Sequence, residues 1–243
     1  MTTEILTIDK GQCLTDVLPA IPANTIFDKT ITGCGATHSE IVNAARHSII
    51  IEPNIPVILG KKAEHPFLFA VYEGITKEDV KAYLAGEHDG YRKIITTPEG
   101  FDKKVLPAMH ELEIPVYKDY FLLFDECEKA IQDVGYRGDI YLPVEDFFKF
   151  ENKAMVSATP IVPSDPRFEE NGFKILKLVP TYDSRIELTL CTTNNTVAVM
   201  RKLLKRLENE TVCVFLNSTE TILSLIYALR LQGRSRVFCS EKA

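Results

Sequence analysis

The sequence predicts an α/β fold with a mainly parallel sheet that carries helices on both faces. Short apolar runs rich in β-branched residues alternate with stretches whose apolar residues recur at helical spacing. Polar clusters follow several of these runs, as expected where ligands bind beyond the carboxyl ends of parallel strands. We expect one α/β domain over residues 1–185, followed by a linker and an incomplete second α/β domain over residues 186–243.

The composition is that of a globular protein. Hydrophobic residues make up 45% of the 243 positions and charged residues 26%, which indicates a packed core. A net charge of −6 disfavours a simple DNA-binding module, so nucleic-acid binding would need a local basic or backbone-donor surface. The six cysteines show neither a C-x-x-C pair nor metal-ligand spacing, and we expect reduced thiols in a cytoplasmic protein. The first ten residues do not resemble a signal peptide, and no apolar run is long enough to span a membrane.

A glycine-rich turn follows the first predicted strand, residues 25–29, and precedes a predicted helix. In a P-loop, glycines let backbone N–H groups surround the phosphates, a lysine reaches the β- and γ-phosphates, and a Ser or Thr binds Mg²⁺. Gly33, Gly35 and Thr37 match this pattern, whereas Ala36 stands where the lysine is expected. A helix that starts after such a turn adds its dipole and free N–H groups to the site. The alternative is a tight turn with a purely structural role.

The other elements are predicted from periodicity and from breaker residues. A Pro-rich connector over residues 161–166 separates the main αβ pattern from the C-terminal part of the chain. The remaining predicted strands occupy residues 48–52, 67–72, 92–96, 120–124, 153–156, 173–179, 185–190, 211–216 and 236–239. The predicted helices occupy residues 39–47, 76–86, 101–112, 129–134, 195–207 and 220–231.

Two carboxylates, Asp125 and Glu126, come directly after a very apolar strand. In phosphoryl transfer from a nucleotide, a strand-end Asp holds Mg²⁺ and a neighbouring carboxylate orients the attacking water. The alternative is that both acids open the following helix, where negative charge offsets the helix dipole.

In their order along the chain, these segments resemble the motifs of superfamily 2 DEAD/DEAH-type helicases. The resemblance is to the first RecA-like domain, with a degenerate Walker A motif, and to the beginning of the second. The matching segments are residues 32–37 (motif I), 51–54 (motif Ia), 97–100 (motif Ib), 125–128 (the DEAD/DEAH box), 157–160 (motif III) and 214–219 (motif IV).

The resemblance implies ATP and Mg²⁺ as cofactors, DNA or RNA as partner, and a role for each matching residue. Thr37 and Asp125 would hold Mg²⁺, and Glu126 would be the catalytic residue that positions water. The implied phosphate-binding residues are Thr32, Gly33, Cys34, Gly35, Ala36 and Thr37. Ser157 and Thr159 would couple the nucleotide state to nucleic-acid contacts made by Pro53, Asn54, Thr97, Pro98, Gly100, Asn217 and Ser218.

Two departures from the family pattern leave alternatives open. Ala36 lacks the ammonium that stabilises transition-state charge, and the family's arginine finger would lie beyond residue 243. Lys29, just before the turn, could supply the missing ammonium, or it could be a solvated strand-end lysine. The sequence is therefore interpreted as an ATP-dependent helicase or translocase with impaired hydrolysis. Alternatives are a non-hydrolysing nucleic-acid-binding or scaffold protein and another P-loop nucleotide hydrolase.

Overall fold

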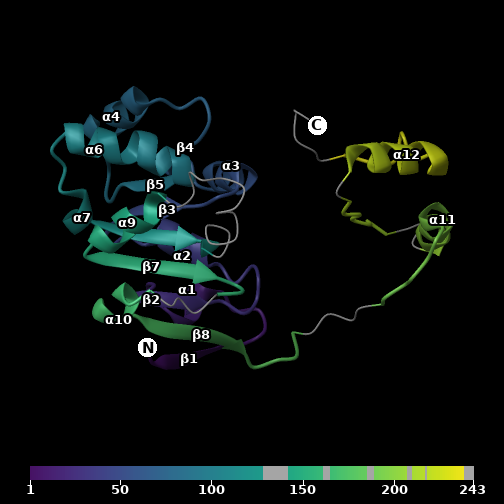
Figure 1. Cartoon of the computed structure of the whole chain (residues 1–243), viewed down its shortest axis with the longest axis horizontal. Coiled ribbons are helices and arrows are strands. Elements are labelled where there is room, and N and C mark those ends of the chain that lie inside the picture. The colour runs from purple at the N-terminus through teal and green to yellow at the C-terminus, as the bar shows by residue number, and fades with distance from the viewer. Residues whose placement is uncertain (128–141, 161–164, 185–188, 207–209, 217, 238–243) are drawn as a thin grey trace. The chain divides into compact units, whose positions relative to one another are not determined.

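A computed structural model describes residues 1–127, 142–160, 165–184, 189–206, 210–216 and 218–237 of the chain (Figure 1). The chain divides into two compact units, unit 1 (Met1–Ser184) and unit 2 (Arg185–Ala243). Among the described residues, no helix combines the length and the apolar character that crossing a membrane requires.

Unit 1 is built on one eight-stranded sheet with the strand order β1-β8-β2-β7-β6-β3-β5-β4. Every pair of neighbouring strands is parallel, so all the carboxyl ends lie along the same edge. The strands are β1 (Thr3–Ile8), β2 (Thr25–Asp28), β3 (His47–Ile51), β4 (Phe69–Val71), β5 (Lys93–Thr96), β6 (Tyr120–Asp125), β7 (Asn152–Ser157) and β8 (Lys174–Pro180).

Helices cover both faces of this sheet. One face carries α1 (Leu14–Val17), α2 (Ala36–Val42) and α3 (Ile55–Glu64). The other carries α4 (Lys77–Ala85), η1 (Phe101–Val105), α6 (Leu106–Glu111), α7 (Val116–Asp119), α9 (Leu142–Lys149) and α10 (Arg167–Glu170). The short helix α5 (Pro98–Gly100) runs directly into η1, which is a π-helical turn.

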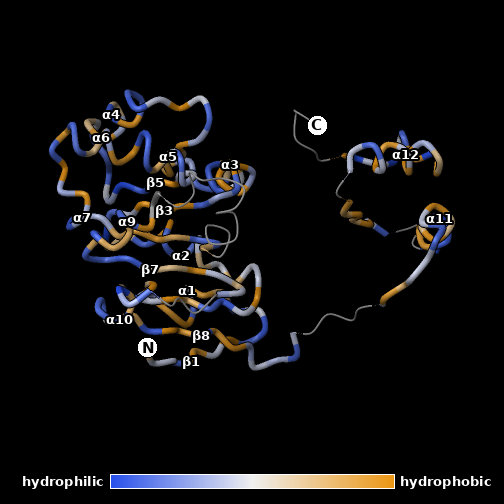
Figure 2. The backbone as a smooth tube through the Cα atoms, viewed as in Figure 1, coloured by the Kyte–Doolittle hydropathy of each residue, from blue (hydrophilic) through white to orange (hydrophobic). Residues whose placement is uncertain are grey.

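The middle residues of the central strands are apolar because both faces of these strands are buried (Figure 2). Along β3, Ile49 and Ile51 pack into one core and Ile50 into the other. Along β6, Leu122 and Phe124 alternate with their neighbours in the same way. The two cores therefore consist of alternate residues of the same strands, which confirms the predicted α/β class with a parallel sheet.

Several element predictions for unit 1 are wrong or shifted. A strand, β1, precedes the run predicted as the first strand, and α3 occupies a stretch without a predicted helix. The helix expected over residues 39–47 starts earlier, at Ala36, and ends before β3. Within the helix expected over residues 101–112, the π-helical turn comes just before Pro107, which has no N–H to donate. The helix predicted over residues 129–134 lies outside the described residues.

The described part of unit 2 contains two helices, α11 (Thr196–Arg206) and α12 (Thr219–Leu229). Asn195 caps α11 as predicted, since its side-chain oxygen accepts the N–H of Ala198 at 3.0 Å. The strand predicted over residues 211–216 is wrong, because no backbone hydrogen bond joins this stretch to another described segment. Residues 189–190 and 236–237 are not strands either, and the rest of those two predictions falls outside the described residues.

A buried polar cluster lies at the amino ends of β3 and β5. Its centre is the fully buried carboxylate of Glu40 on α2, which accepts bonds from Arg46 at 3.0 and 2.5 Å and from Ser48 at 2.5 Å. The ammonium of Lys93 lies 3.6 Å from Glu40 and donates to Ser48 at 2.8 Å. Burial lowers the pKa of Lys93 to about 8, although the Glu40 carboxylate opposes this shift. The buried Lys93 and the half-buried Arg46 thus share one buried carboxylate.

Gly100 is held where no side chain fits. A Cβ at this position would lie 2.6 Å from Thr96 Oγ1 and 3.3 Å from the carbonyl oxygen of Val71. Gly100→Ala is therefore expected to lower the free energy of unfolding by about 1–3 kcal/mol through overpacking. Gly60→Ala is the control, because its Cβ would meet nothing within 4 Å and alanine favours the helix by about 0.5–1 kcal/mol. Urea denaturation of both variants measures the difference, and equal stabilities would contradict the prediction.

Candidate nucleotide site

The carboxyl ends of four neighbouring strands, β2, β7, β6 and β3, bring polar residues to one edge of the sheet. Lys29 follows β2, Ser157 ends β7, Asp125 ends β6 and Glu52 follows β3. All four are buried, with exposed fractions of 8% for Lys29 and 2% or less for the other three. Polar groups are costly to bury without partners, so their hydrogen bonds define the site.

The side chain of Lys29 reaches across the end of β7 to the carboxylates of Asp125, the last residue of β6, and Glu126, the next residue. Its ammonium lies 2.7 Å from Glu126 Oε1 and 3.3 Å from Asp125 Oδ1. Burial alone would lower the pKa of Lys29, but the charges of Asp125 and Glu126 outweigh burial and hold it above its ordinary value. Lys29 is therefore a charged member of the cluster and not a solvated lysine at the surface.

Asp125 also contacts the glycine-rich turn through Thr37, in the first turn of α2. The Thr37 hydroxyl donates a hydrogen bond to Asp125 Oδ2. The backbone N–H of Glu126 donates to Asp125 Oδ1 at 3.0 Å, and Glu126 adopts a left-handed φ of +49°. A non-glycine residue in this conformation carries strain of about 1–3 kcal/mol, which is typical of functional sites.

The turn itself has the backbone that its glycines suggest. Gly33 and Gly35 have φ values of +74° and +86°, a region that favours glycine. Thr32 and Gly33 are exposed, whereas Cys34 and Ala36 are buried in the core beneath α1 and α2. The side chain of Ala36 therefore packs into the core.

Of the two residues expected to couple the site to nucleic acid, Ser157 contacts Lys29 and Thr159 contacts Ser157. Ser157 accepts the backbone N–H of Lys29 on its carbonyl oxygen at 2.9 Å, and its hydroxyl accepts the N–H of Thr159 at 2.9 Å. Ser157 is fully buried, while Thr159 is exposed. Hydrogen bonds through the backbone and the side chain of Ser157 thus connect Lys29 to Thr159 at the surface.

The residues expected to contact nucleic acid in unit 1 follow the neighbouring strands β3 and β5. Pro53 and Asn54 are half-buried at the start of α3. The side chains of Thr97 and Pro98 are buried, as is Gly100, and the Thr97 hydroxyl accepts the N–H of Gly100 at 3.0 Å to cap α5. Residues 97–100 form a tightly packed turn, in which Thr97, Pro98 and Gly100 are buried and Glu99 is partly exposed.

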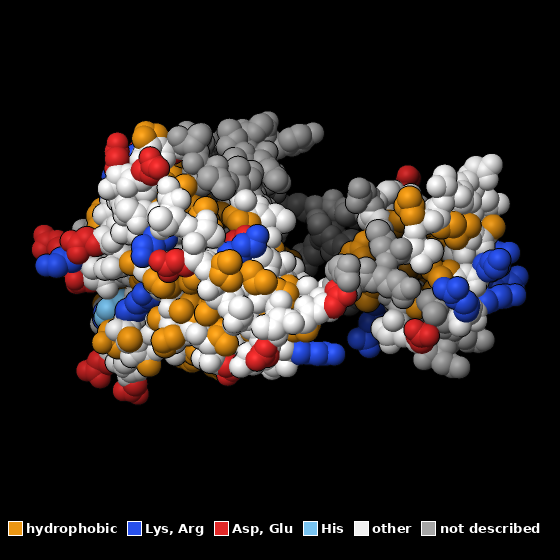
Figure 3. Space-filling view, turned by 90° about the horizontal axis from the view of Figure 1, so that it is seen from below, with side chains coloured by type: hydrophobic (Ala, Val, Ile, Leu, Met, Phe, Trp, Pro, Cys, Tyr) orange, Lys and Arg blue, Asp and Glu red, His pale blue; other side chains and the backbone are white. Residues whose placement is uncertain are grey.

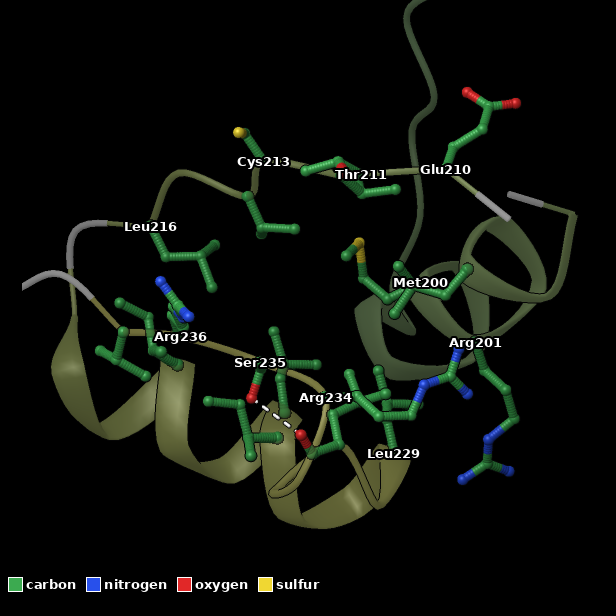
Figure 4. Close-up of a pocket in the computed structure, with 18 of the residues that line it drawn as sticks. Met200, Arg201, Glu210, Thr211, Cys213, Leu216, Leu229, Arg234, Ser235 and Arg236 are labelled. Atoms are coloured by element: carbon green, nitrogen blue, oxygen red, sulfur yellow. Dashed lines mark hydrogen bonds between the residues drawn. The ribbon is translucent and has the colours of Figure 1, made fainter. Parts of the chain in front are cut away.

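Of the two residues expected to bind nucleic acid in unit 2, Asn217 lies outside the described residues. Ser218 caps α12, since its hydroxyl accepts the N–H of Thr221 at 3.2 Å. A groove of about 800 Å³ in unit 2 lies between α11, residues 211–216 and α12 (Figure 4). Its lining is mainly apolar, and no pair of described carboxylates faces a lysine there. The candidate nucleotide site is therefore the edge of the sheet in unit 1.

Glu52 belongs to this edge, although the sequence did not predict it as a site residue. One of its oxygens accepts two bonds from Asn54, from the backbone N–H at 2.8 Å and from the side-chain amide at 2.7 Å. Burial, together with the negative charge of Asp125, raises the pKa of Glu52 to about 7, against the effect of the Asn54 bonds. The sequence signals for Glu52 were its place at the end of the predicted strand over residues 48–52 and within residues 51–54, which resemble motif Ia.

The raised pKa of Glu52 makes stability depend on pH. Between pH 4.5 and about 7 the folded chain binds the proton that the unfolded chain has lost, so the free energy of unfolding falls as the pH rises. Glu52→Gln retains the oxygen that accepts the Asn54 bonds and is expected to stabilise the chain by about 1–3 kcal/mol at pH 8. The gain should vanish near pH 4. Chemical denaturation at both pH values measures it, and a gain independent of pH would contradict the assignment.

The sequence matches no protein-family model and no curated protein. Among solved structures, the chain is similar to the one described as "Crystal Structure of DUF1998 helicase MrfA", with a TM-score of 0.56 and 14% sequence identity. The likeness covers 89% of this chain but only 38% of that helicase chain. At this identity the likeness concerns the fold alone. The chain therefore has a helicase-like α/β fold, consistent with the RecA-like fold expected from its motifs.

Proposed function

We propose that the chain is the nucleotide-binding part of an ATP-dependent helicase or translocase. The proposal is carried by one observation: the Lys29 ammonium, the Thr37 hydroxyl and the carboxylates of Asp125 and Glu126 meet at the carboxyl edge of a parallel sheet. Phosphoryl transfer from a nucleotide requires a cation for the phosphates, oxygen ligands for Mg²⁺ and a carboxylate that positions water. The helicase-like fold supports nucleic acid as the partner.

The donor set of Thr37 and Asp125 fits Mg²⁺. This ion prefers oxygen ligands and usually takes one or two carboxylates, with water and substrate phosphates completing its shell. A hydroxyl and a carboxylate already in contact offer such oxygens. Among the described residues, no group of three or more His, Cys, Asp or Glu side chains could hold a metal by itself. Bound Mg²⁺ would neutralise charge on the phosphates.

Lys29 takes the role of the missing P-loop lysine in this proposal. Its side chain enters from the end of β2 and not from α2, and its ammonium lies within the acid pair. Glu126 positions water, while Ser157 and Thr159 link the site to the surface. The other assigned roles follow the family pattern. The residues that surround the phosphates are Thr32, Gly33, Cys34, Gly35 and Ala36. The residues that contact the nucleic acid are Pro53, Asn54, Thr97, Pro98, Gly100, Asn217 and Ser218.

A second candidate is a nucleic-acid-binding or scaffold protein that does not hydrolyse ATP. The burial of Ala36 favours it, because α2 directs no ammonium toward the phosphates from that position. In this case the ion pair of Lys29 with Asp125 and Glu126 would be structural. The third candidate, a P-loop hydrolase without a nucleic-acid partner, uses the same site. A cytoplasmic location remains a prediction from the cysteine pattern.

Two measurements on the same sample distinguish the candidates. Calorimetric titration with ATP and Mg²⁺ measures nucleotide binding, and phosphate release with and without single-stranded DNA or RNA measures turnover. Turnover that oligonucleotides stimulate is the result expected for the helicase or translocase. Oligonucleotide binding without turnover indicates the scaffold, and turnover indifferent to oligonucleotides indicates the third candidate. Absence of any nucleotide binding would overturn the assignment of the site.

A further inference from the structure

The charge of the chain is divided unevenly between its two units. Residues 185–243 carry nine Lys and Arg against five Asp and Glu, whereas the whole chain has a net charge of −6. Lys and Arg side chains gather on one side of the unit that contains α11 and α12 (Figure 3). Unit 2 is therefore basic within an acidic protein, and a local basic surface is what nucleic-acid binding requires.

Four of these cations form a basic face on α11, composed of Arg201, Lys202, Lys205 and Arg206. All four are exposed, and no ion pair joins any of them to a described carboxylate. Arg201 instead donates to the carbonyl oxygen of Ala228 on α12 at 3.2 Å. The sequence contains no Asp or Glu between Glu187 and Glu208.

The arrangement of these charges is unfavourable for an isolated helix. Arg201 and Lys205 are four residues apart, as are Lys202 and Arg206, so each pair places like charges next to each other on the helix surface. Cations in the last turn favour the helix dipole, which accounts for Lys205 and Arg206. The dipole does not account for Arg201 and Lys202, which lie further from the carboxyl end. A polyanion bound along the helix would relieve the repulsion of all four.

Two apolar side chains of α11 face a groove. Met200 and Leu204 line the groove between α11 and α12, together with Arg201 and Lys205 of the basic face. A helix that binds a membrane surface instead needs an exposed apolar face beside its cations. The basic face of α11 therefore fits an extended chain of phosphates better than a lipid surface.

We propose that the basic face of α11 binds the phosphate backbone of a nucleic-acid strand. The inference rests on the proposed function, in which nucleic acid is the partner, and it adds a contact surface outside the segments that resemble helicase motifs. Lys and Arg contacts to phosphates release counterions, so binding through them weakens steeply as salt increases. Contacts to phosphates do not distinguish one base from another, so oligonucleotides of equal length and different sequence should bind with the same affinity.

Fluorescence anisotropy of the whole chain with a labelled single-stranded oligonucleotide, measured at several salt concentrations, tests this inference. The test variant is Lys202→Gln/Lys205→Gln, in which glutamine keeps the helix propensity. The control is Lys10→Gln/Lys118→Gln, which removes the same charge from two exposed lysines of unit 1. The test variant should raise the dissociation constant about tenfold and reduce the salt slope by about 1.4, or about 0.7 for each lost contact.

Equal changes in the test and control variants would overturn the inference. So would binding of vesicles containing anionic lipid that depends on Lys202 and Lys205 while oligonucleotide binding does not, because the partner would then be a membrane. The Mg²⁺-ATP titration tests the nucleotide site independently of the basic face. If nucleotide fails to bind but the test variant loses oligonucleotide affinity as expected, the nucleotide site is wrong and the basic face is supported.

Discussion

Glu40→Ala is expected to lower the free energy of unfolding by about 3–5 kcal/mol, the largest stability effect predicted for this chain. Glu40 is fully buried and is the carboxylate that both Arg46 and Lys93 face. Its removal leaves the buried Lys93 and the half-buried Arg46 without this counter-charge. Burial already lowers the pKa of Lys93 to about 8, and without the carboxylate its charge would become still less favourable.

A surface ion pair supplies the control for this variant. Glu4 lies 2.9 Å from Lys174, and both side chains are 57% exposed. Pairs of this kind contribute about 0–1 kcal/mol, so Glu4→Ala should leave the urea midpoint nearly unchanged. A loss of less than about 1 kcal/mol in Glu40→Ala would show that water or rearranged side chains replace the carboxylate.

Lys29→Ala is expected to weaken Mg²⁺-ATP binding at least about tenfold and to reduce any turnover by about 100-fold, the range found when one charge-stabilising donor is removed. The ammonium that faces Asp125 and Glu126 is the cation among the residues assigned to this site. Without it, two carboxylates at the strand end repel the phosphates. Titration calorimetry and phosphate release measure the two effects.

Lys177→Ala is the matched control for Lys29. Lys177, on β8, lies 3.6 Å from Asp28 at the end of β2, and its side chain is 46% exposed. Its loss should leave nucleotide affinity within about twofold, because an exposed charge is screened by solvent. If Lys29→Ala leaves the nucleotide affinity unchanged, Lys29 does not take the role of the P-loop lysine. This conclusion holds whatever the variant does to the free energy of unfolding.

The sequence predicted the sheet of unit 1 well where strands are buried on both faces. Apolar runs such as residues 120–124 and 48–52 permit few other interpretations, and they form β6 and β3. The edge strand β1 was missed because its residues are mostly exposed and so lack a continuous apolar run. Helix α3 was missed because Pro53 suggested a loop, although the helix begins two residues later and has Pro56 in its first turn, where a proline is compatible with a helix.

In unit 2 the same method failed for a physical reason. Residues 211–216 have the β-branched and aromatic composition of a buried strand, but a strand exists only when a neighbour pairs with it. The composition of a segment sets its propensity to form a strand, whereas the pairing of that strand depends on whether another strand lies beside it. Phe215 is an example: its aromatic side chain favours a buried strand, yet it is 91% exposed.

For the candidate site, sequence order identified the residues but not their contacts. The match of the glycine turn and of Asp125 to one family pattern placed Thr37 and Asp125 in one site, and the structure brings them into contact. The ion pair of Lys29 depends on the order β2-β7-β6, which no local pattern contains. Glu52 was overlooked because its burial beside Asp125 depends on the pairing of β3 with β6.

Helix α2 is fixed at both of its ends, and this has a mechanical consequence. Thr37 in its first turn is bonded to Asp125, and Glu40 one turn later is bonded to Arg46 and Ser48. These contacts hold α2 in place at Thr37 and Glu40. The segment before α2 contains Gly33 and Gly35, whose φ values of +74° and +86° lie in the region that favours glycine, so we expect any backbone change beside the site to occur in this segment.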